Sequence, residues 1–343
     1  MPKLIVSPAP HLRRNDSVRK VMIDVLLALL PATLWSIWNF GHRALILCIL
    51  GVVGAELIEL FIMRVLRKRT DFISDGSAAV TGLLLALNVS STLPWYLLLL
   101  GLFFALGVGK HVYGGLGHNP FNPALVGRVF LMISFPIEMT RFEIPRAWAL
   151  GEAVTGASPA QWEGIYTGAT PLGLLQGGGF ERASNQFSYG DLFFGNIGGS
   201  LGEISALMLL IGCVYLIIRM RIKLLVPISY IGSVLLMTSV FFGMDGTQFG
   251  SPLFHILSGG LMLGALYMAT DMVTSPSSMK GQLIFGIGCG IVTVLIRLFS
   301  GMPEGVSYSI LIMNAFKPII DRYTRPRILG QQRIKPKEVR SNG

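Results

Sequence analysis

Charge is scarce in this sequence. Charged residues make up only 13% of the 343 residues, compared with about 25% in an ordinary soluble domain. So little charge cannot cover the surface of a water-soluble globule. The 52% of hydrophobic residues also excludes intrinsic disorder, which requires low hydrophobicity. With a mean hydropathy of +0.62, the composition predicts a polytopic membrane protein.

Cysteine is also scarce, and the sequence shows neither the cysteine spacing of a metal site nor the pattern of a signal peptide. Cys48, Cys213 and Cys289 lie far apart, each inside an apolar run. No CxxC or Cys/His spacing occurs, which excludes an iron–sulfur or zinc site encoded by this chain alone. We interpret the three thiols as small buried hydrophobic side chains. Residues 1–20 contain only a short apolar patch, so we expect no cleaved signal peptide.

Apolar runs long enough to cross a bilayer are abundant. A transmembrane helix needs about 20 mostly apolar residues, and ten such candidates predict an all-α fold. Two are short: one is bracketed by prolines and one is rich in glycine, as in discontinuous helices beside a binding site. The ten segments are 21–40, 43–63, 73–91, 94–110, 122–137, 196–218, 223–243, 253–270, 281–300 and 304–320.

The distribution of lysine and arginine supports this map. If both termini are cytoplasmic, the inside segments carry 22 Lys/Arg and the outside loops carry four. This bias explains the net charge of +10 without a nucleic acid partner. The predicted parts are a cytoplasmic N-terminal segment (1–20), a first membrane half (21–137), an extracytoplasmic loop (138–195), a second membrane half (196–320) and a basic cytoplasmic tail beside lipid (321–343).

The ten segments could be two units of five. A unit with an odd number of spans that duplicates gives halves of opposite orientation. The segments SAAVTGLLLALNVSSTLP, near residue 77, and SGGLMLGALYMATDMVTSP, near residue 258, are alike. Helices rich in small residues also resemble one another by chance, so an inverted repeat and a chance likeness both remain open.

The tetrapeptide TGAT at 167–170 is the first candidate for chemistry. One interpretation is a turn, because Gly168 allows a positive φ and threonine suits loops. The other is an attachment site, in which the Thr170 hydroxyl is esterified to a phosphate. Thr167, Gly168 and Ala169 would then be its small neighbours, which allow close approach to the backbone.

The stretch GKHVYGGLGHNPFNPALVG at 109–127 is the second candidate. Its glycines are not a dinucleotide-binding fingerprint, because no strand precedes them. It predicts either a loop–helix junction with an asparagine cap or a re-entrant element that lines a cavity. His111 and His118 lie seven residues apart, but no further ligand pattern supports a metal site.

Several ionisable residues lie in or at the ends of the predicted spans. Such residues usually face the bundle interior and have a role, although snorkelling and structural ion pairs are equally good explanations for any one of them. Glu56 and Glu59 are three apart and share a helix face. An acidic cluster facing Arg128 in the cytoplasmic half would form a cation vestibule. The candidate ion-pathway residues are Asp24, Glu56, Glu59, Asp75 and Asp271.

Five longer segments together resemble a known family. The chain is similar to the D subunit of the Rnf complex, the ion-translocating ferredoxin:NAD oxidoreductase. It is similar, more distantly, to the B subunit of the sodium-translocating NADH:quinone oxidoreductase. The matching segments are SPAPHLRRNDSVRKVMIDVLLALLPA at 7–32, GGLGHNPFNPALVGRVFLMISFP at 114–136, TGATPL at 167–172, ATDMVTSPSSMKGQLIFG at 269–286 and PEGVSYSILIMNAFKPIIDRYTRPR at 303–327.

The resemblance implies a flavoprotein subunit of a redox-driven ion-translocating oxidoreductase. It implies covalent FMN, joined by a phosphoester to the last threonine of [Ser/Thr]-Gly-Ala-Thr, here Thr170, and a non-covalent flavin, riboflavin, that no motif places. A flavin transferase would install the FMN outside the cytoplasm. The implied partners are other Rnf subunits, including a second flavin-bearing subunit and iron–sulfur subunits. The implied location is the bacterial inner membrane. The implied fold is of the urea-transporter type, with inverted halves.

One departure from the family pattern leaves an alternative open. Relatives commonly have an acidic residue six positions before the modified threonine, where this chain has Gly164. Ser158 does have an acid, Glu152, at that distance. Thr170 remains the predicted site because Pro-Leu follows it, as in relatives. The alternative function is a passive channel or secondary transporter on the same scaffold, without redox activity; a purely structural membrane scaffold is the third.

Overall fold

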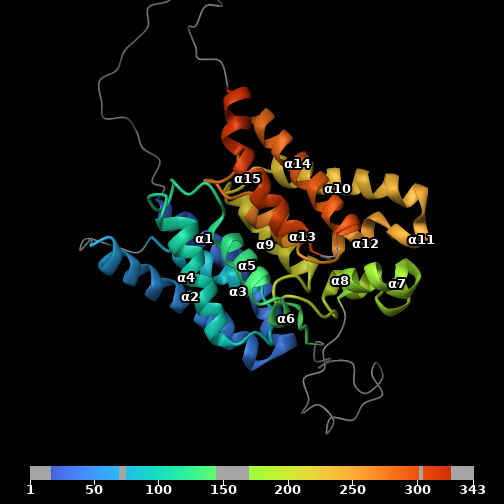
Figure 1. The fold of residues 1–343 in the computed structure, drawn as a ribbon, viewed down its shortest axis with the longest axis horizontal. Coiled ribbons are helices and arrows are strands. Elements are labelled where there is room, and N and C mark those ends of the chain that lie inside the picture. The colour runs from blue at the N-terminus through green and yellow to red at the C-terminus, as the bar shows by residue number, and fades with distance from the viewer. Residues whose placement is uncertain (1–16, 69–74, 144–169, 301–303, 326–343) are drawn as a thin grey trace, which may run out of the picture.

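The chain forms two groups of helices that pack against each other. The computed structural model describes residues 17–68, 75–143, 170–300 and 304–325. Within these ranges every regular element is a helix. The N-terminal group, blue to green in Figure 1, lies beside the C-terminal group, yellow to red. The structure therefore confirms an all-α protein.

The helices have the following bounds, where η marks a π-helical segment. The first group contains α1 (Val18–Phe40), α2 (His42–Phe61), η1 (Ile62–Leu66), α3 (Ser77–Leu87), α4 (Trp95–Leu106), η2 (Gly107–His111), α5 (Pro123–Ser134) and α6 (Pro136–Thr140). Between the two groups along the chain come α7 (Pro171–Gln186) and α8 (Tyr189–Phe194), which contact α11 and α12 of the second group. The second contains α9 (Ala206–Ile218), α10 (Leu225–Met244), α11 (Gly246–Phe249), α12 (Pro252–Leu257), α13 (Leu261–Leu263), η5 (Gly264–Met268), α14 (Met279–Phe299) and α15 (Val306–Tyr323).

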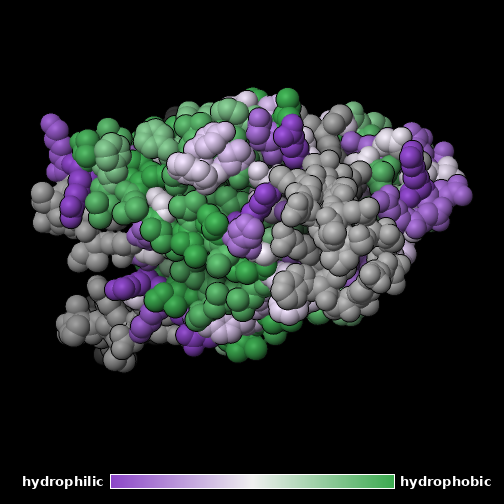
Figure 2. All heavy atoms as spheres, turned by 90° about the horizontal axis from the view of Figure 1, so that it is seen from below, coloured by the Kyte–Doolittle hydropathy of each residue, from purple (hydrophilic) through white to green (hydrophobic). Residues whose placement is uncertain are grey.

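Four helices in the described ranges are long and apolar enough to cross a membrane, or five if one bent pair counts as one span. They are Val18–Phe40, His42–Leu66, Leu225–Met244 and Met279–Phe299. Other predicted spans contain shorter apolar helices, such as α3 and α9. On the face in Figure 2, hydrophobic residues gather over the left and the centre, while hydrophilic residues lie at both ends and in a few places between them. This surface suits a protein surrounded by lipid.

The glycine-rich segment 253–270 is discontinuous, as the sequence predicts. The stretch Gly246–Leu257 meets Leu261–Met268 at an angle of 45°. Gly259, in the break, has a φ of 68°, which favours glycine. Arg297 on α14 donates to the carbonyls of His255, at 2.6 Å, and Ser258, at 3.2 Å. These bonds satisfy carbonyl groups that the end of α12 leaves without helical partners.

The sixth predicted span, 196–218, is wrong in its first part. The helix α9 begins only at Ala206, and the glycine-rich stretch before it is not helical. Its backbone instead bonds to the end of α3: Leu201 N donates to Val89 O at 3.0 Å and Gly202 N donates to Leu87 O at 2.7 Å. Glycine lowers helix propensity, and here it also allows this close backbone approach.

The predicted extracytoplasmic loop contains helices that its polar composition did not indicate. Thr170 caps the N-terminus of α7, and Ser188 caps α8 through a capping box with Asp191. Residues 144–169 lie outside the described part of the chain. The side of the membrane on which these helices lie follows only from the charge distribution and remains a prediction.

Candidate functional site

Thr170 is positioned by the first turn of α7. Its side chain accepts a hydrogen bond from the backbone N–H of Gly173 at 3.1 Å, and Pro171 occupies the first helical position. The threonine is half-buried. As an acceptor in this cap, the hydroxyl oxygen keeps its own O–H free for another partner. Thr167, Gly168, Ala169 and the alternative site Ser158 lie outside the described residues.

A small cavity of about 10 Å³ connects Thr170 with two carboxylates. These are Glu203, in the non-helical stretch before α9, and Glu304, just before α15. Gly260 packs directly against Glu203: a Cβ at this position would lie 2.5 Å from Glu203 Oε1, so no larger residue fits. The residues around the cavity are Thr170, Pro171, Leu172, Ile197, Gly198, Gly199, Glu203, Gly259 and Glu304.

Arg128 on α5 holds the two carboxylates together. Its guanidinium forms an ion pair with Glu203 at 2.7 Å and another with Glu304, and it also donates to the side chain of Asn88. The Arg128 side chain is only 3% exposed. Because a lone charge is expensive to bury, these pairs are what allow Arg128 to lie inside the bundle.

The expectation that Arg128 faces the candidate ion-pathway carboxylates is wrong. None of the described ion pairs of Arg128 involves them, because its partners Glu203 and Glu304 come from the second half of the chain. Glu203 was missed altogether. Its signal was a carboxylate inside a predicted span, 196–218, but a glycine-rich sequence does not show which distant cation it meets.

A second polar cluster joins α2, α3 and η2. Lys110 donates to Glu59 and, at 2.6 Å, to the hydroxyl of Ser77, which in turn donates to Asp75. His111 Nε2 lies 3.1 Å from the same Glu59 oxygen. The structure therefore brings the predicted residues Glu59 and Asp75 into one cluster through a lysine and a serine.

The other candidate ion-pathway residues lie at different places. Glu56 accepts from the backbone N–H of Ala79, at 3.2 Å, beside the second cluster. Asp24 on α1 pairs with Arg221 at 2.6 Å and with Arg219 at 3.2 Å. Asp271 accepts from the hydroxyl of Thr274 at 3.1 Å. The five residues therefore form no single vestibule in this conformation.

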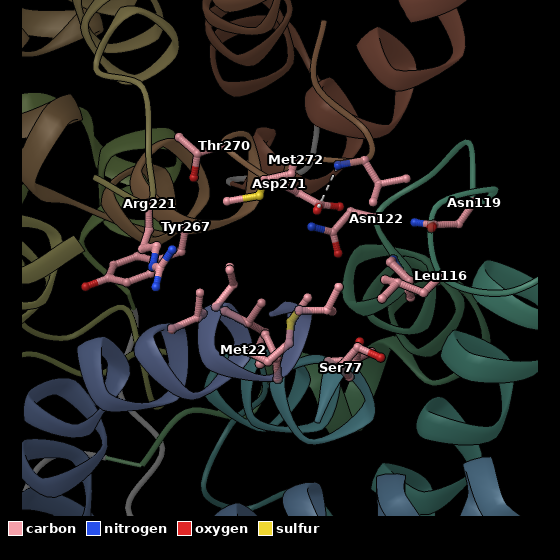
Figure 3. Close-up of a pocket in the computed structure, with 18 of the residues that line it drawn as sticks. Met22, Ser77, Leu116, Asn119, Asn122, Arg221, Tyr267, Thr270, Asp271 and Met272 are labelled. Atoms are coloured by element: carbon pink, nitrogen blue, oxygen red, sulfur yellow. Dashed lines mark hydrogen bonds between the residues drawn. The ribbon is translucent and has the colours of Figure 1, made fainter. Parts of the chain in front are cut away.

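A larger cavity of about 380 Å³ lies between the two groups of helices. Ligand sites in proteins typically measure about 300–1,000 Å³ and carry a few polar groups in apolar walls. Figure 3 shows Asn122 and Asp271 across this cavity from Met22 and Ser77, with Arg221 and Tyr267 at one end. Asn119 lies on its wall and Lys110 also contributes to it.

The stretch 109–127 is an irregular connection that lines this cavity. Asn122 caps α5, followed by Pro123, as the loop–helix interpretation predicts. Asn119 donates to the carbonyl of Phe121 at 3.0 Å. His111 contacts Glu59, whereas His118 is exposed. No group of three or more metal-ligating side chains occurs in the part of the chain that the structure describes.

The surroundings of Thr170 fit a phosphoester. The N-terminus of a helix attracts anions through its free N–H groups and its dipole, and Thr170 lies at that end of α7. An ester would keep the oxygen that accepts from Gly173. The two carboxylates nearby are matched by two arginines, since Arg297 Nη2 lies 3.2 Å from where a Cβ of Gly259 would stand. The pocket therefore does not carry an excess of negative charge that would repel a phosphate.

Comparison with known proteins identifies the family. The family model described as "NQR2, RnfD, RnfE family" matches residues 5–330. The chain belongs to this family. The resemblance to the Rnf D subunit, based on five segments, is thereby confirmed over nearly the whole chain.

Relatives within the NQR2, RnfD, RnfE family match along nearly their full length. The D subunit of a proton-translocating ferredoxin:NAD(+) oxidoreductase complex from Clostridium ljungdahlii is 42% identical over 333 residues, covering 96% of both chains. The D subunit of a Na(+)-translocating ferredoxin:NAD(+) oxidoreductase complex from Acetobacterium woodii is 42% identical and covers 97% of both. The D subunit of an ion-translocating oxidoreductase complex from Stutzerimonas stutzeri is 40% identical, covering 92% of this chain and 93% of its own.

Proposed function

We propose that this chain is the membrane-embedded D subunit of an ion-translocating ferredoxin:NAD oxidoreductase complex, and that Thr170 carries FMN through a phosphoester. Membership of the family and the names of the relatives support the complex. The observation that supports the attachment site is the position of Thr170, at the N-terminus of α7 and beside the buried Arg128–Glu203–Glu304 cluster.

The residues around Thr170 would hold and orient the group rather than react with it. A bound flavin supplies the electron transfer. Gly173 N–H would continue to cap α7 through the ester oxygen, which fixes the first turn of the helix. Gly199, which lines the same small cavity, leaves room there, since a Cβ at Gly199 would meet nothing within 4 Å. The paired charges of Arg128 and the two carboxylates would keep the local field balanced.

The large central cavity is our proposed site for the non-covalent flavin, riboflavin. Its volume of about 380 Å³ lies in the range of small-molecule sites. Apolar side chains of α1 and α3 would contact the flat ring system, and the amides of Asn119 and Asn122 would bind its polar edge. Asp271 and Thr270 offer further hydrogen-bonding groups on the same wall.

Ten spans in two inverted halves are our proposed topology. The contacts support a two-fold arrangement, because α1 packs on α9 and α5 packs on α15, the corresponding members of the two groups. With both termini cytoplasmic, α7 and Thr170 would lie outside the cytoplasm, where a flavin transferase would act. The proposed location is a bacterial inner membrane, and the proposed partners are the other subunits of the complex, including iron–sulfur subunits and a second flavin-bearing subunit.

Ion translocation would use carboxylates that face the bundle interior. Glu59 and Asp75 are the strongest candidates, because they lie together beside the central cavity. Relatives are named for protons and for Na⁺, so both ions are candidates here. A ligand or redox state must bind two conformations differently to shift between them, and the charge added by flavin reduction would supply that difference.

The test of the attachment site is the modified peptide itself. The whole complex is matured in cells that contain the transferase, and denatured protein is examined on a gel under ultraviolet light. We expect fluorescence in the native chain and none in Thr170→Ala. Mass spectrometry of the peptide spanning 147–182 should place FMN on Thr170.

Thr170→Ser is the matched control, because it keeps a hydroxyl and the cap. A fluorescent Thr170→Ala chain with FMN on Ser158 would move the site to the alternative serine. A colourless native chain would remove the redox assignment and leave a passive channel or secondary transporter on the same scaffold.

A further inference from the structure

Lys110 is a buried cation enclosed by oxygen atoms from two other helices. Its side chain is 3% exposed. Nζ donates to Glu59 of α2 and to Ser77 Oγ, at 2.6 Å, at the start of α3. Ser77 is itself bound to Asp75. Carboxylate and hydroxyl oxygens are the ligands that hard metal cations prefer, so the ammonium lies where a small cation could be bound.

The same cluster contains polar atoms whose hydrogen-bonding capacity is unused. Glu59 is 1% exposed and His111 is 8% exposed. Among the described residues, neither Glu59 Oε2 nor His111 Nδ1 has a hydrogen-bond partner. Buried polar groups are nearly always satisfied, and exceptions call for an explanation such as an absent ion. While Lys110 pairs with one oxygen of Glu59, the other oxygen is therefore left for a small cation to bind.

The cluster has a route to the central cavity. Lys110 and Ser77 are both part of the cavity wall, whereas Glu59 is not. The lysine side chain therefore separates Glu59 from the cavity. A lysine has a flexible four-carbon stem, so its ammonium can turn while the backbone stays in place. Asp271 and Asn122, which line the same cavity across from Ser77, offer oxygen atoms to an ammonium that turns inward.

We propose that Lys110 is a tethered cation that competes with the transported ion for Glu59. A monovalent cation, Na⁺ or a proton, binds Glu59 only when the Lys110 ammonium leaves it for the cavity. The exchange replaces one positive charge by another, so the buried carboxylate is never left alone. Lys110 thereby closes the site between transport events. This inference rests on the proposed function, because it assigns a control element to the same ion pathway.

The first test measures ion leakage through the reconstituted complex without ferredoxin or NAD. Lys110→Gln should raise passive uptake of ²²Na⁺, or proton leakage reported by a pH-sensitive dye, at least tenfold. The arm that responds identifies the ion. Adding Glu59→Gln to Lys110→Gln should return the flux to background. Lys110→Arg keeps the positive charge and should keep the low ion flux of the native complex. Lys280→Gln, which removes an exposed lysine, is the matched control.

The second test uses the native complex and does not depend on the folding of a variant. Amine acetylation is measured by peptide mass spectrometry as the ratio of labelling at Lys110 to labelling at Lys280, because lowering the pH protonates both amines and slows both reactions. This ratio should rise with Na⁺ but not with choline, or as the pH is lowered if the ion is a proton. The proposal would be overturned if labelling of Lys110 changed neither with Na⁺ nor with pH. So would a Lys110→Gln complex with normal flavin fluorescence and native fluxes. Absence of FMN on Thr170 refutes only the proposed cofactor site and leaves both readouts on Lys110 intact.

Discussion

Removal of the Arg128 guanidinium should be one of the most destabilising single changes in this protein. Arg128→Met leaves the buried Glu203 and the partly buried Glu304 without their shared cation. Breaking a buried ion pair by removing one partner typically costs about 3–5 kcal/mol. Two carboxylates lose their partner here, and Asn88 loses a donor, so we expect a value at the upper end of that range.

Equilibrium unfolding in mixed micelles, with increasing fractions of a denaturing detergent, measures this loss. Arg182→Met, at an exposed position on α7, is the matched control and should change stability by less than about 1 kcal/mol. The triple variant Arg128→Met, Glu203→Gln, Glu304→Gln leaves no charge among these three side chains and should recover much of the loss. The reasoning is refuted if Arg128→Met is as stable as the control, or if the triple variant is less stable than Arg128→Met.

Three other contacts lead to measurable effects. Gly290→Ala should destabilise by about 1–3 kcal/mol, because its Cβ would lie 1.8 Å from Ser233 Oγ and 2.9 Å from Tyr230 O. Gly232→Ala on α10 is the control and should not destabilise the protein, because its Cβ would meet nothing within 4 Å. Equal losses of unfolding free energy in the two variants would contradict this packing. Arg297→Ala should cost about 1–3 kcal/mol for each carbonyl group left without a partner, and should raise amide exchange at Ser258–Gly260. At the end of α10, the hydroxyl of Thr247 holds the pKa of Asp245 below its usual 3.8. Since that folded-state pKa is lowered, the stabilising contribution is complete above about pH 3.8 and is lost as the pH falls through the lowered value. Asp245→Asn should abolish this pH dependence of unfolding, which acid titration would show.

The sequence predicts features that depend on local composition. Glycine-rich and proline-bracketed segments indicated the break at Gly259 and the short helix α5, because backbone freedom and missing N–H groups act within a few residues. TGAT predicts Thr170 as the attachment site, and that assignment stays a prediction. The start of the segment 196–218 was wrong, because apolar composition alone does not distinguish a buried non-helical stretch from a helix.

The partners of the buried charges could not be predicted. Arg128, Glu203 and Glu304 are far apart in the chain, and their meeting depends on how the two groups of helices pack. The same holds for Lys110, which lies at the end of an apolar helix and gave no sign that it binds Glu59. Periodicity places a charge on a helix face, but tertiary packing decides what that face contacts.

The close fit of α10 and α14 has a mechanical consequence. Gly286 and Gly290 on α14 leave no room for a Cβ because Ser229 and Ser233 of α10 press against them, and Arg297 on the same α14 clasps the broken end of α12. We therefore expect these three helices to move together as one rigid unit. Bending it would strip many small-residue contacts at once.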